Sequence, residues 1–190
     1  MVTSERSGLC DAEDSLLVLV DIQARLVAAM PEEPGRQMLR NSTILLEAAT
    51  LLEIPVIVSE QYPQGLGRTV AGIMQGLPSA AQSFEKSAFS CYGSVEFMQA
   101  VNKHRRRQII MVGLEAHICV LQTALELRAT GLQTFVVEDA CCSRTASNSH
   151  NAFSRLRHAG VIVSNTESVL FEWMRHAGHE HFKKISALIH

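Results

Sequence analysis

The sequence predicts a doubly wound α/β fold of the Rossmann-like kind, in which a six-stranded, mostly parallel sheet carries helices on both faces. Short runs rich in β-branched residues alternate with longer segments of helical periodicity, the pattern of repeated βαβ units. The chain has 190 residues, 47% of them hydrophobic and 19% charged, which is ordinary for a globular protein. No repeat, linker or low-complexity stretch interrupts the pattern, so we expect one domain over residues 1–190.

Six short apolar segments are predicted to be the strands. Strands of a parallel sheet are covered on both faces, and they therefore read as nearly continuous apolar runs. The segments are Leu16–Val20, Val56–Ser59, Gln82–Glu85, Gln108–Val112, Thr134–Val137 and Val161–Ser164.

Helices are predicted between these strands and after the last one. Pro55 marks the exit from the first helix, and Gly131 and Gly160 are typical helix stops. Thr166 is expected to cap the helix that ends at Trp173. Residues 1–15 are polar and are expected to be loosely ordered. The predicted helices are Arg36–Leu52, Val95–Asn102, Ile118–Thr130, Ser147–His158, Thr166–Trp173 and Glu180–Ile189.

Charge and cysteine content limit the partners and the compartment. With 17 Lys and Arg against 19 Asp and Glu, the net charge of -2 gives no reason to expect nucleic acid or a membrane as a partner. The basic run 104–107 is interpreted as a solvated helix end, with a phosphate-binding patch as the alternative. Five cysteines without a secretory signal favour a reducing compartment, so we expect a cytoplasmic protein, with organellar import left open.

An acid, a base and a thiol follow three of the predicted strands. Asp21 comes directly after the first strand, Lys86 after the third, and Cys119 after the fourth, where the next helix begins. Ligands of open parallel sheets bind beyond the carboxyl ends of the strands, so the three side chains should meet there. Taken singly, each has another interpretation: Asp21 as a helix or turn cap, Lys86 as a surface charge, and Cys119 as an inert core residue.

Their chemistry fits nucleophilic catalysis. A helix amino terminus and a nearby ammonium group both favour thiolate over thiol, so we expect a lowered pKa for Cys119 and fast alkylation at neutral pH. Asp21 could take the thiol proton and later deliver it to a leaving group. Backbone N–H groups at the same helix start could stabilise an oxyanion.

Two longer motifs carry a family resemblance. The segments 60–67 (EQYPQGLG) and 113–120 (GLEAHICV), together with Asp21 and Lys86, resemble the isochorismatase-like cysteine hydrolases, and most of all the isochorismatase domain-containing proteins. The resemblance covers Leu16 to Val169. It implies a catalytic triad of Asp21, Lys86 and Cys119, an oxyanion hole formed by the N–H groups of Ala116 and Cys119, a cis peptide before Ala116, and assembly into homo-oligomers.

Further residues are assigned to the substrate pocket, and none to a metal. Related nicotinamidases carry an Asp/His metal cluster after the second strand, but residues 59–63 hold no histidine, so we expect neither a metal nor another cofactor. For His117 a structural or pocket-lining role is favoured over that of a base. For the aromatic pocket residues the alternative is a place in the core. The expected pocket residues are Leu26, Tyr62, Phe89, Glu115 and His117.

The predicted function is hydrolysis of a small-molecule amide or related C–N bond through a thioester intermediate. The main alternative is a catalytically silent, oligomeric interaction protein. A thiol-redox protein is a third possibility, although the chain has no Cys-x-x-Cys pair. The apolar segment 169–174 suggests a subunit interface at Trp173, with an intramolecular helix as the alternative of equal weight.

Overall fold

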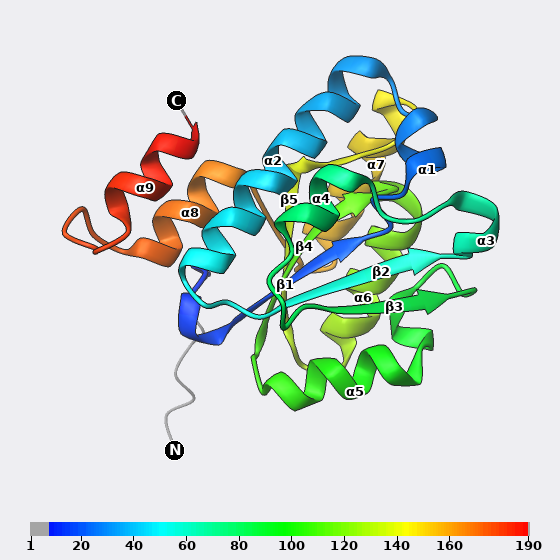
Figure 1. The fold of residues 1–190 in the computed structure, drawn as a ribbon. Coiled ribbons are helices and arrows are strands. Elements are labelled where there is room, and N and C mark those ends of the chain that lie inside the picture. Colours follow the sequence, from blue (N-terminus) through cyan, green and yellow to red (C-terminus); the bar gives the residue numbers. More distant parts are fainter. Residues whose placement is uncertain (1–7, 190) are drawn as a thin grey trace.

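The computed structural model describes residues 8–189 and confirms the predicted fold class (Figure 1). All strand pairs in the six-stranded sheet are parallel, and the strand order is β3-β2-β1-β4-β5-β6. This order is that of a doubly wound sheet, with its switch point between β1 and β4. The strands are β1 (Ser15–Val20), β2 (Val56–Gln61), β3 (Gln82–Lys86), β4 (Gln108–Leu114), β5 (Gln133–Cys142) and β6 (Ile162–Ser164).

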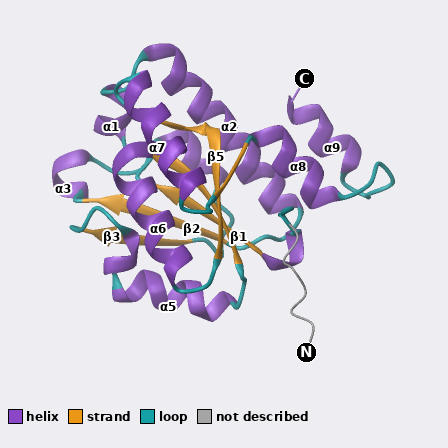
Figure 2. Cartoon of the chain, turned by 180° about the vertical axis from the view of Figure 1, so that it is seen from behind, coloured by secondary structure: helices purple, strands orange, loops and turns teal. Residues whose placement is uncertain are grey.

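The sheet separates two apolar cores, and Figures 1 and 2 show helices on both of its faces. Every residue of β1 is buried, with Leu17 and Leu19 in one core and Leu16, Val18 and Val20 in the other. Such alternation on a strand buried on both faces explains the unbroken apolar run in the sequence.

The helices form one layer on each face of the sheet. The long helix α2 lies on one face with α4 and α8, and α5, α6 and α7 cover the other. The bounds are α1 (Ala24–Ala28), α2 (Glu32–Leu51), α3 (Pro63–Leu66), α4 (Ala71–Gly76), α5 (Val95–His104), α6 (Leu121–Ala129), α7 (Ala146–His158), α8 (Thr166–Met174) and α9 (Phe182–Ser186). No helix within residues 8–189 is long and apolar enough to cross a bilayer.

One helix cap and several helix starts differ from the prediction: α2 begins at Glu32 rather than Arg36, and α9 at Phe182 rather than Glu180. Asn165, not Thr166, caps α8, because the Asn165 side chain accepts a hydrogen bond from the Ser168 N–H, whereas Thr166 bonds to Asp139. The helix expected from Ile118 begins earlier, as a π-helical turn over Ala116–Val120 that continues into α6.

The segment that precedes β1 is held against α8. The Cys10 N–H donates to Glu172 Oε2 at 2.7 Å, and the Trp173 indole donates to Ser15 Oγ at 2.9 Å. Residues 10–15 are therefore tied to the body of the protein, unlike the loosely ordered segment expected, while residues 1–7 lie outside the described residues. Trp173 is only 3% exposed, so the intramolecular alternative holds for this side chain and the proposed interface at Trp173 is wrong.

Candidate active site

The structure brings Asp21, Lys86 and Cys119 together at the carboxyl edge of the sheet. Lys86 Nζ lies 2.7 Å from Asp21 Oδ2, and both side chains are buried. The Cys119 thiol, in the π turn after β4, lies close enough to Asp21 to interact with its carboxylate. Asp21 is thus the shared partner of an ammonium group and a thiol.

Two side chains at the end of β2 support this contact, and the sequence analysis gave them no role. Ser59 Oγ donates to Asp21 Oδ1 at 2.7 Å. Lys86 Nζ donates to Gln61 Oε1 at 2.7 Å and to the Phe89 carbonyl at 2.9 Å. Each charged group is therefore held in place by hydrogen bonds with neutral groups as well as by its counter-ion. The signal in the sequence is the polar run that ends β2, the neighbour of β1.

Gln23 holds the loop that follows β2. Its buried side chain donates to the carbonyls of Gln61, at 3.0 Å, and Gly67, at 2.6 Å, and it accepts from the Gln61 N–H at 2.7 Å. The segments after β1 and β2 are consequently tied together beside Asp21.

A close backbone approach determines where Asp21 lies. Gly113 of β4 pairs with Val20, the last residue of β1, and has a φ of 117°. A Cβ atom at position 113 would lie 2.1 Å from the Val20 carbonyl oxygen. Only glycine tolerates this combination of positive φ and close contact.

The electrostatics of the thiol contradict the expected low pKa. Burial raises the pKa of Cys119 far above its usual range, the Asp21 carboxylate raises it further, and Lys86 only partly opposes them. Burial lowers the pKa of Lys86, but the charge of Asp21 and its hydrogen bond with Lys86 outweigh burial, so the pKa is raised. The site at neutral pH is a charged Lys86–Asp21 pair beside a neutral thiol.

A second cysteine, Cys91, lies in the same buried environment. Its thiol interacts with Ser59 and Thr123, and its N–H donates to Thr123 Oγ1 at 2.9 Å. Burial, followed by the charge of Asp21, raises the pKa of Cys91. The second thiol is therefore neutral as well.

The π turn contains the N–H groups assigned to the oxyanion hole. Ala116 and Cys119 belong to this turn, in which the Glu115 carbonyl accepts from the N–H groups of Ile118 and Val120. The cis peptide is the Leu114–Glu115 bond, one residue before the expected position.

The expected pocket residues fall into two groups. Tyr62 and Phe89 are 59% and 57% exposed, so the alternative of aromatic core residues does not hold, and Leu26 is half-buried. Glu115 is buried and accepts from Arg144 Nε at 3.0 Å. His117 Nδ1 lies 2.9 Å from Ser143 Oγ, in line with a structural role.

No group of three His, Cys, Asp or Glu side chains within residues 8–189 is arranged to hold a metal ion. Glu60, a buried residue of β2, accepts from the Thr69 N–H at 2.7 Å and from Arg68 at 2.8 Å. Its carboxylate is thereby committed to the loop that follows β2.

Known proteins resemble this chain over most of its length. The isochorismatase domain family matches residues 15–168. The isochorismatase domain-containing protein 2 of Bos taurus is 37% identical over 92% of this chain and 82% of its own. The MAR1 ribonuclease structure from Caenorhabditis elegans is 33% identical, with a TM-score of 0.89 over 95% of this chain and 92% of that one. The YcaC gene product of Escherichia coli, an octameric hydrolase of unknown specificity, is 24% identical, with a TM-score of 0.89 over 95% of this chain and 89% of its own, and shows the same fold.

Proposed function

The chain belongs to the isochorismatase family of hydrolases, and from this premise we propose that it cleaves a small amide or related C–N bond through a thioester on Cys119. The observation that carries the proposal is the buried ion pair of Asp21 with Lys86 beside the Cys119 thiol. A buried ion pair touching a thiol contributes little to stability, but it can move a proton and stabilise an anion.

In the first half of the reaction, Asp21 takes the proton of the Cys119 thiol while the sulfur attacks the amide carbonyl carbon. The carbonyl oxygen becomes an oxyanion, stabilised by the N–H groups of Ala116 and Cys119. Asp21 then delivers the proton to the leaving nitrogen. The C–N bond breaks, the amine departs, and a thioester remains.

In the second half, a water molecule replaces the amine. Asp21 takes a proton from the water, whose oxygen attacks the thioester carbon. The tetrahedral intermediate expels the Cys119 sulfur, which recovers the proton from Asp21, and the carboxylic acid leaves. Amide and water become acid and amine, and the protein returns to its starting state.

The decisive experiment is a screen of small amides, ureas and carbamoyl compounds by amine or ammonia release. Wild type is expected to turn over at least one of them, and the Cys119→Ala variant none. The matched control is Cys141→Ala, because Cys141 is also a buried free cysteine. Mass spectrometry of quenched reactions should find the acyl group on the peptide that contains Cys119.

Turnover that survives in Cys119→Ala would contradict the covalent mechanism. No turnover of any compound, with no acylated peptide, would favour the silent interaction protein instead. The proposed mechanism uses no metal, so the activity should survive EDTA; loss in EDTA with recovery on adding zinc would overturn that part.

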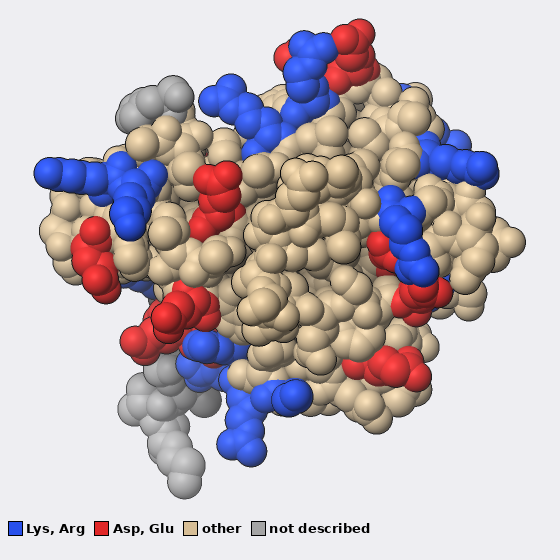
Figure 3. Space-filling model, viewed as in Figure 1, with Lys and Arg blue, Asp and Glu red and all other residues tan. Residues whose placement is uncertain are grey.

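RNA hydrolysis is the second candidate, because the C. elegans relative is a ribonuclease. The charges of this chain speak against it: its net charge is -2, and acidic and basic side chains are interspersed on the face shown in Figure 3. A surface that binds phosphodiesters is expected to be basic. Cleavage of a labelled single-stranded RNA by wild type but not by Cys119→Ala would establish this second function.

Self-association and a cytoplasmic location remain proposals. The octameric E. coli relative supports an oligomer, and Phe171, 41% exposed on α8, is an apolar side chain available for contact where Trp173 is not. Sedimentation at micromolar concentration tests this. A single species of 20.9 kDa would refute the oligomer.

A further inference from the structure

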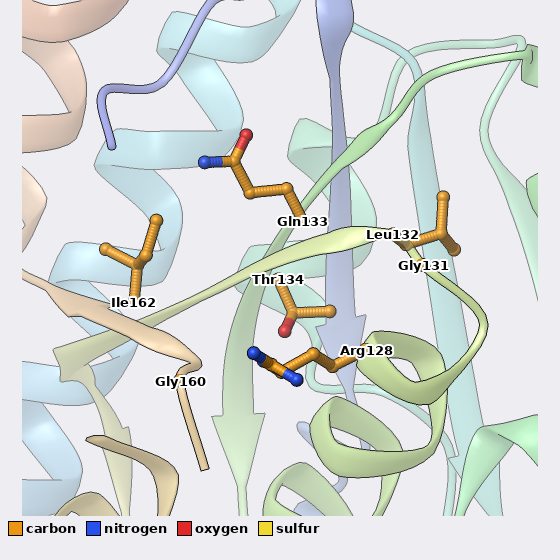
Figure 4. A pocket seen from close by; sticks show the side chains of 7 residues that line it. All are labelled: Arg128, Gly131, Leu132, Gln133, Thr134, Gly160 and Ile162. Atoms are coloured by element: carbon orange, nitrogen blue, oxygen red, sulfur yellow. The ribbon is translucent and has the colours of Figure 1, made fainter. Parts of the chain in front are cut away.

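We propose that a cavity at the amino end of the sheet, away from Cys119, binds a small oxyanion through Arg128 and Thr134. The cavity has a volume of about 300 Å³ and lies between the ends of α6 and α7, where β5 and β6 begin (Figure 4). Its walls include Arg128, Gly131, Thr134, Gly160 and Ile162. The site is separate from the proposed catalytic edge, so its ligand is not the hydrolysed substrate.

The first observation is a buried hydroxyl group without a partner. Thr134 is 2% exposed, and within residues 8–189 its Oγ1 has no hydrogen-bond partner. Side chains alternate along β5, and Val136 belongs to the core on the side of α6 and α7, so Thr134 faces the same side. Leaving a buried hydroxyl unpaired is unfavourable, and an acceptor oxygen in the cavity would remove that cost.

The second observation is a guanidinium group beside this hydroxyl. Arg128 lies in the last turn of α6 and forms neither an ion pair nor a side-chain hydrogen bond with the part of the chain that the structure describes. In Figure 4 its guanidinium and the Thr134 hydroxyl point toward one another. An oxyanion between them would accept from both groups, with the planar guanidinium able to bind two of its oxygens.

Gly160 makes room for this arrangement. Its φ is 76°, and a Cβ atom at this position would lie 2.5 Å from Arg128 Nη2. A larger residue would push the guanidinium away from the cavity. The arginine therefore lies over Thr134 only because position 160 has no side chain.

The exposed carbonyl groups at the carboxyl end of a helix ordinarily disfavour anions. At the ends of α6 and α7, carbonyl groups near the cavity instead accept hydrogen bonds from the chain itself. The Arg128 carbonyl accepts from the Gly131 N–H at 2.9 Å, the Leu127 carbonyl from Thr130, and the Arg157 carbonyl from the Gly160 N–H at 3.0 Å. The last turn of α7 adds the basic residue Arg155, whereas Arg157 in the same turn is paired with Glu138 at 2.7 Å. Arg128 is therefore the charged residue that lines the cavity, and its positive charge is the one that an oxyanion there would meet.

Calorimetric titration of the full chain with inorganic phosphate, and separately with succinate, tests the site at constant ionic strength. Saturable binding of phosphate alone points to a phosphate-bearing ligand, and binding of succinate alone to a carboxylate. Arg128→Gln should weaken the Kd at least about tenfold, because it removes a charge-assisted hydrogen bond. Thr134→Val keeps the shape of the side chain and should weaken binding as well.

Thermal unfolding supplies a second readout. Without ligand, Thr134→Val is expected to raise the Tm, since it replaces an unpaired hydroxyl by a methyl group, and phosphate should no longer raise it further. The matched control is Arg40→Gln, an exposed arginine of α2 without an ion pair among the described residues, which should bind as wild type does. Absence of saturable binding of either anion, or binding that persists in both variants, would overturn the proposal.

Discussion

Removing one partner of the buried Lys86–Asp21 ion pair should destabilise the protein strongly. The pair is 2.7 Å apart, and its side chains are 2% and 0% exposed, so each charge depends on the other. Lys86→Met leaves the Asp21 carboxylate with uncharged partners, and Asp21→Asn leaves the ammonium group without its counter-ion. We expect each variant to lose about 3–5 kcal/mol of unfolding free energy, a large share of the roughly 5–15 kcal/mol typical of a domain.

The double variant Asp21→Asn/Lys86→Met should lose much less than the sum of the single losses, because it buries no uncompensated charge. Urea unfolding followed by the fluorescence of the single Trp173 measures all four corners of the cycle. The matched control is the exposed pair of Arg157 and Glu138, also 2.7 Å apart, whose removal should cost below about 1 kcal/mol. Additive losses at Asp21 and Lys86 would refute the reasoning, since they would mean that the two charges are stabilised independently.

Three further predictions concern single groups. Asp21→Asn removes a negative charge that raises the pKa of Cys119. At pH 7, iodoacetamide should therefore label Cys119 faster in this variant than in wild type, while turnover falls. Slower labelling of Cys119, measured by peptide mapping, would contradict this. Gly113→Ala should lower the Tm by several degrees and reduce activity, because the new Cβ atom would clash with the backbone of β1. Gly72→Ala, in open space on α4, should leave the Tm equal or higher. The same change in Tm for both variants would count against the close approach at Gly113. Burial tends to raise the pKa of Glu60, but hydrogen bonds from Thr69 and Arg68 lower it below 4.5. The Glu60 carboxylate therefore stabilises the fold above pH 4.5, and this contribution is lost as the pH falls through the lowered pKa. Glu60→Gln should flatten this part of the acid unfolding curve, and an unchanged curve would disprove the assignment.

The sheet could be predicted because its strands are apolar on both faces. All six predicted strands overlap with observed ones, but β2, β3, β4 and β5 extend further at their carboxyl ends. The extension of β2 contains Glu60 and Gln61, and their polar side chains interrupt the apolar run by which a buried strand is recognised in the sequence. The short helices α1, α3 and α4 were missed because contacts distant in sequence hold them, such as the hydrogen bond from the Val70 N–H to the Ile22 carbonyl.

The convergence of Asp21, Lys86 and Cys119 could be predicted from topology, but their electrostatics could not. Strand order fixes which residues meet at the switch point. The sign of a pKa shift depends on how deeply the group is buried and on which charge is nearer, and neither is readable from spacing. Cys119 was assigned a low pKa from the helix start and Lys86, whereas burial and Asp21 dominate. The sequence does not decide between the two placements of Trp173 for a related reason, since its hydrogen-bond partner Ser15 is 158 residues away in the sequence.

The raised pKa of Cys119 is compatible with the proposed mechanism, because transfer of the thiol proton to Asp21 leaves the number of charges in the site unchanged. Release of the thiol proton to solvent would place a thiolate beside the Asp21 carboxylate, two negative charges against the single positive charge of Lys86. Transfer of the same proton to Asp21 leaves one negative and one positive charge, as before the transfer. The buried site therefore disfavours a free-standing thiolate more than it disfavours one formed by transfer to Asp21. It follows that the nucleophile should form only as Asp21 becomes protonated, which is the state in which Asp21 can donate to the leaving nitrogen.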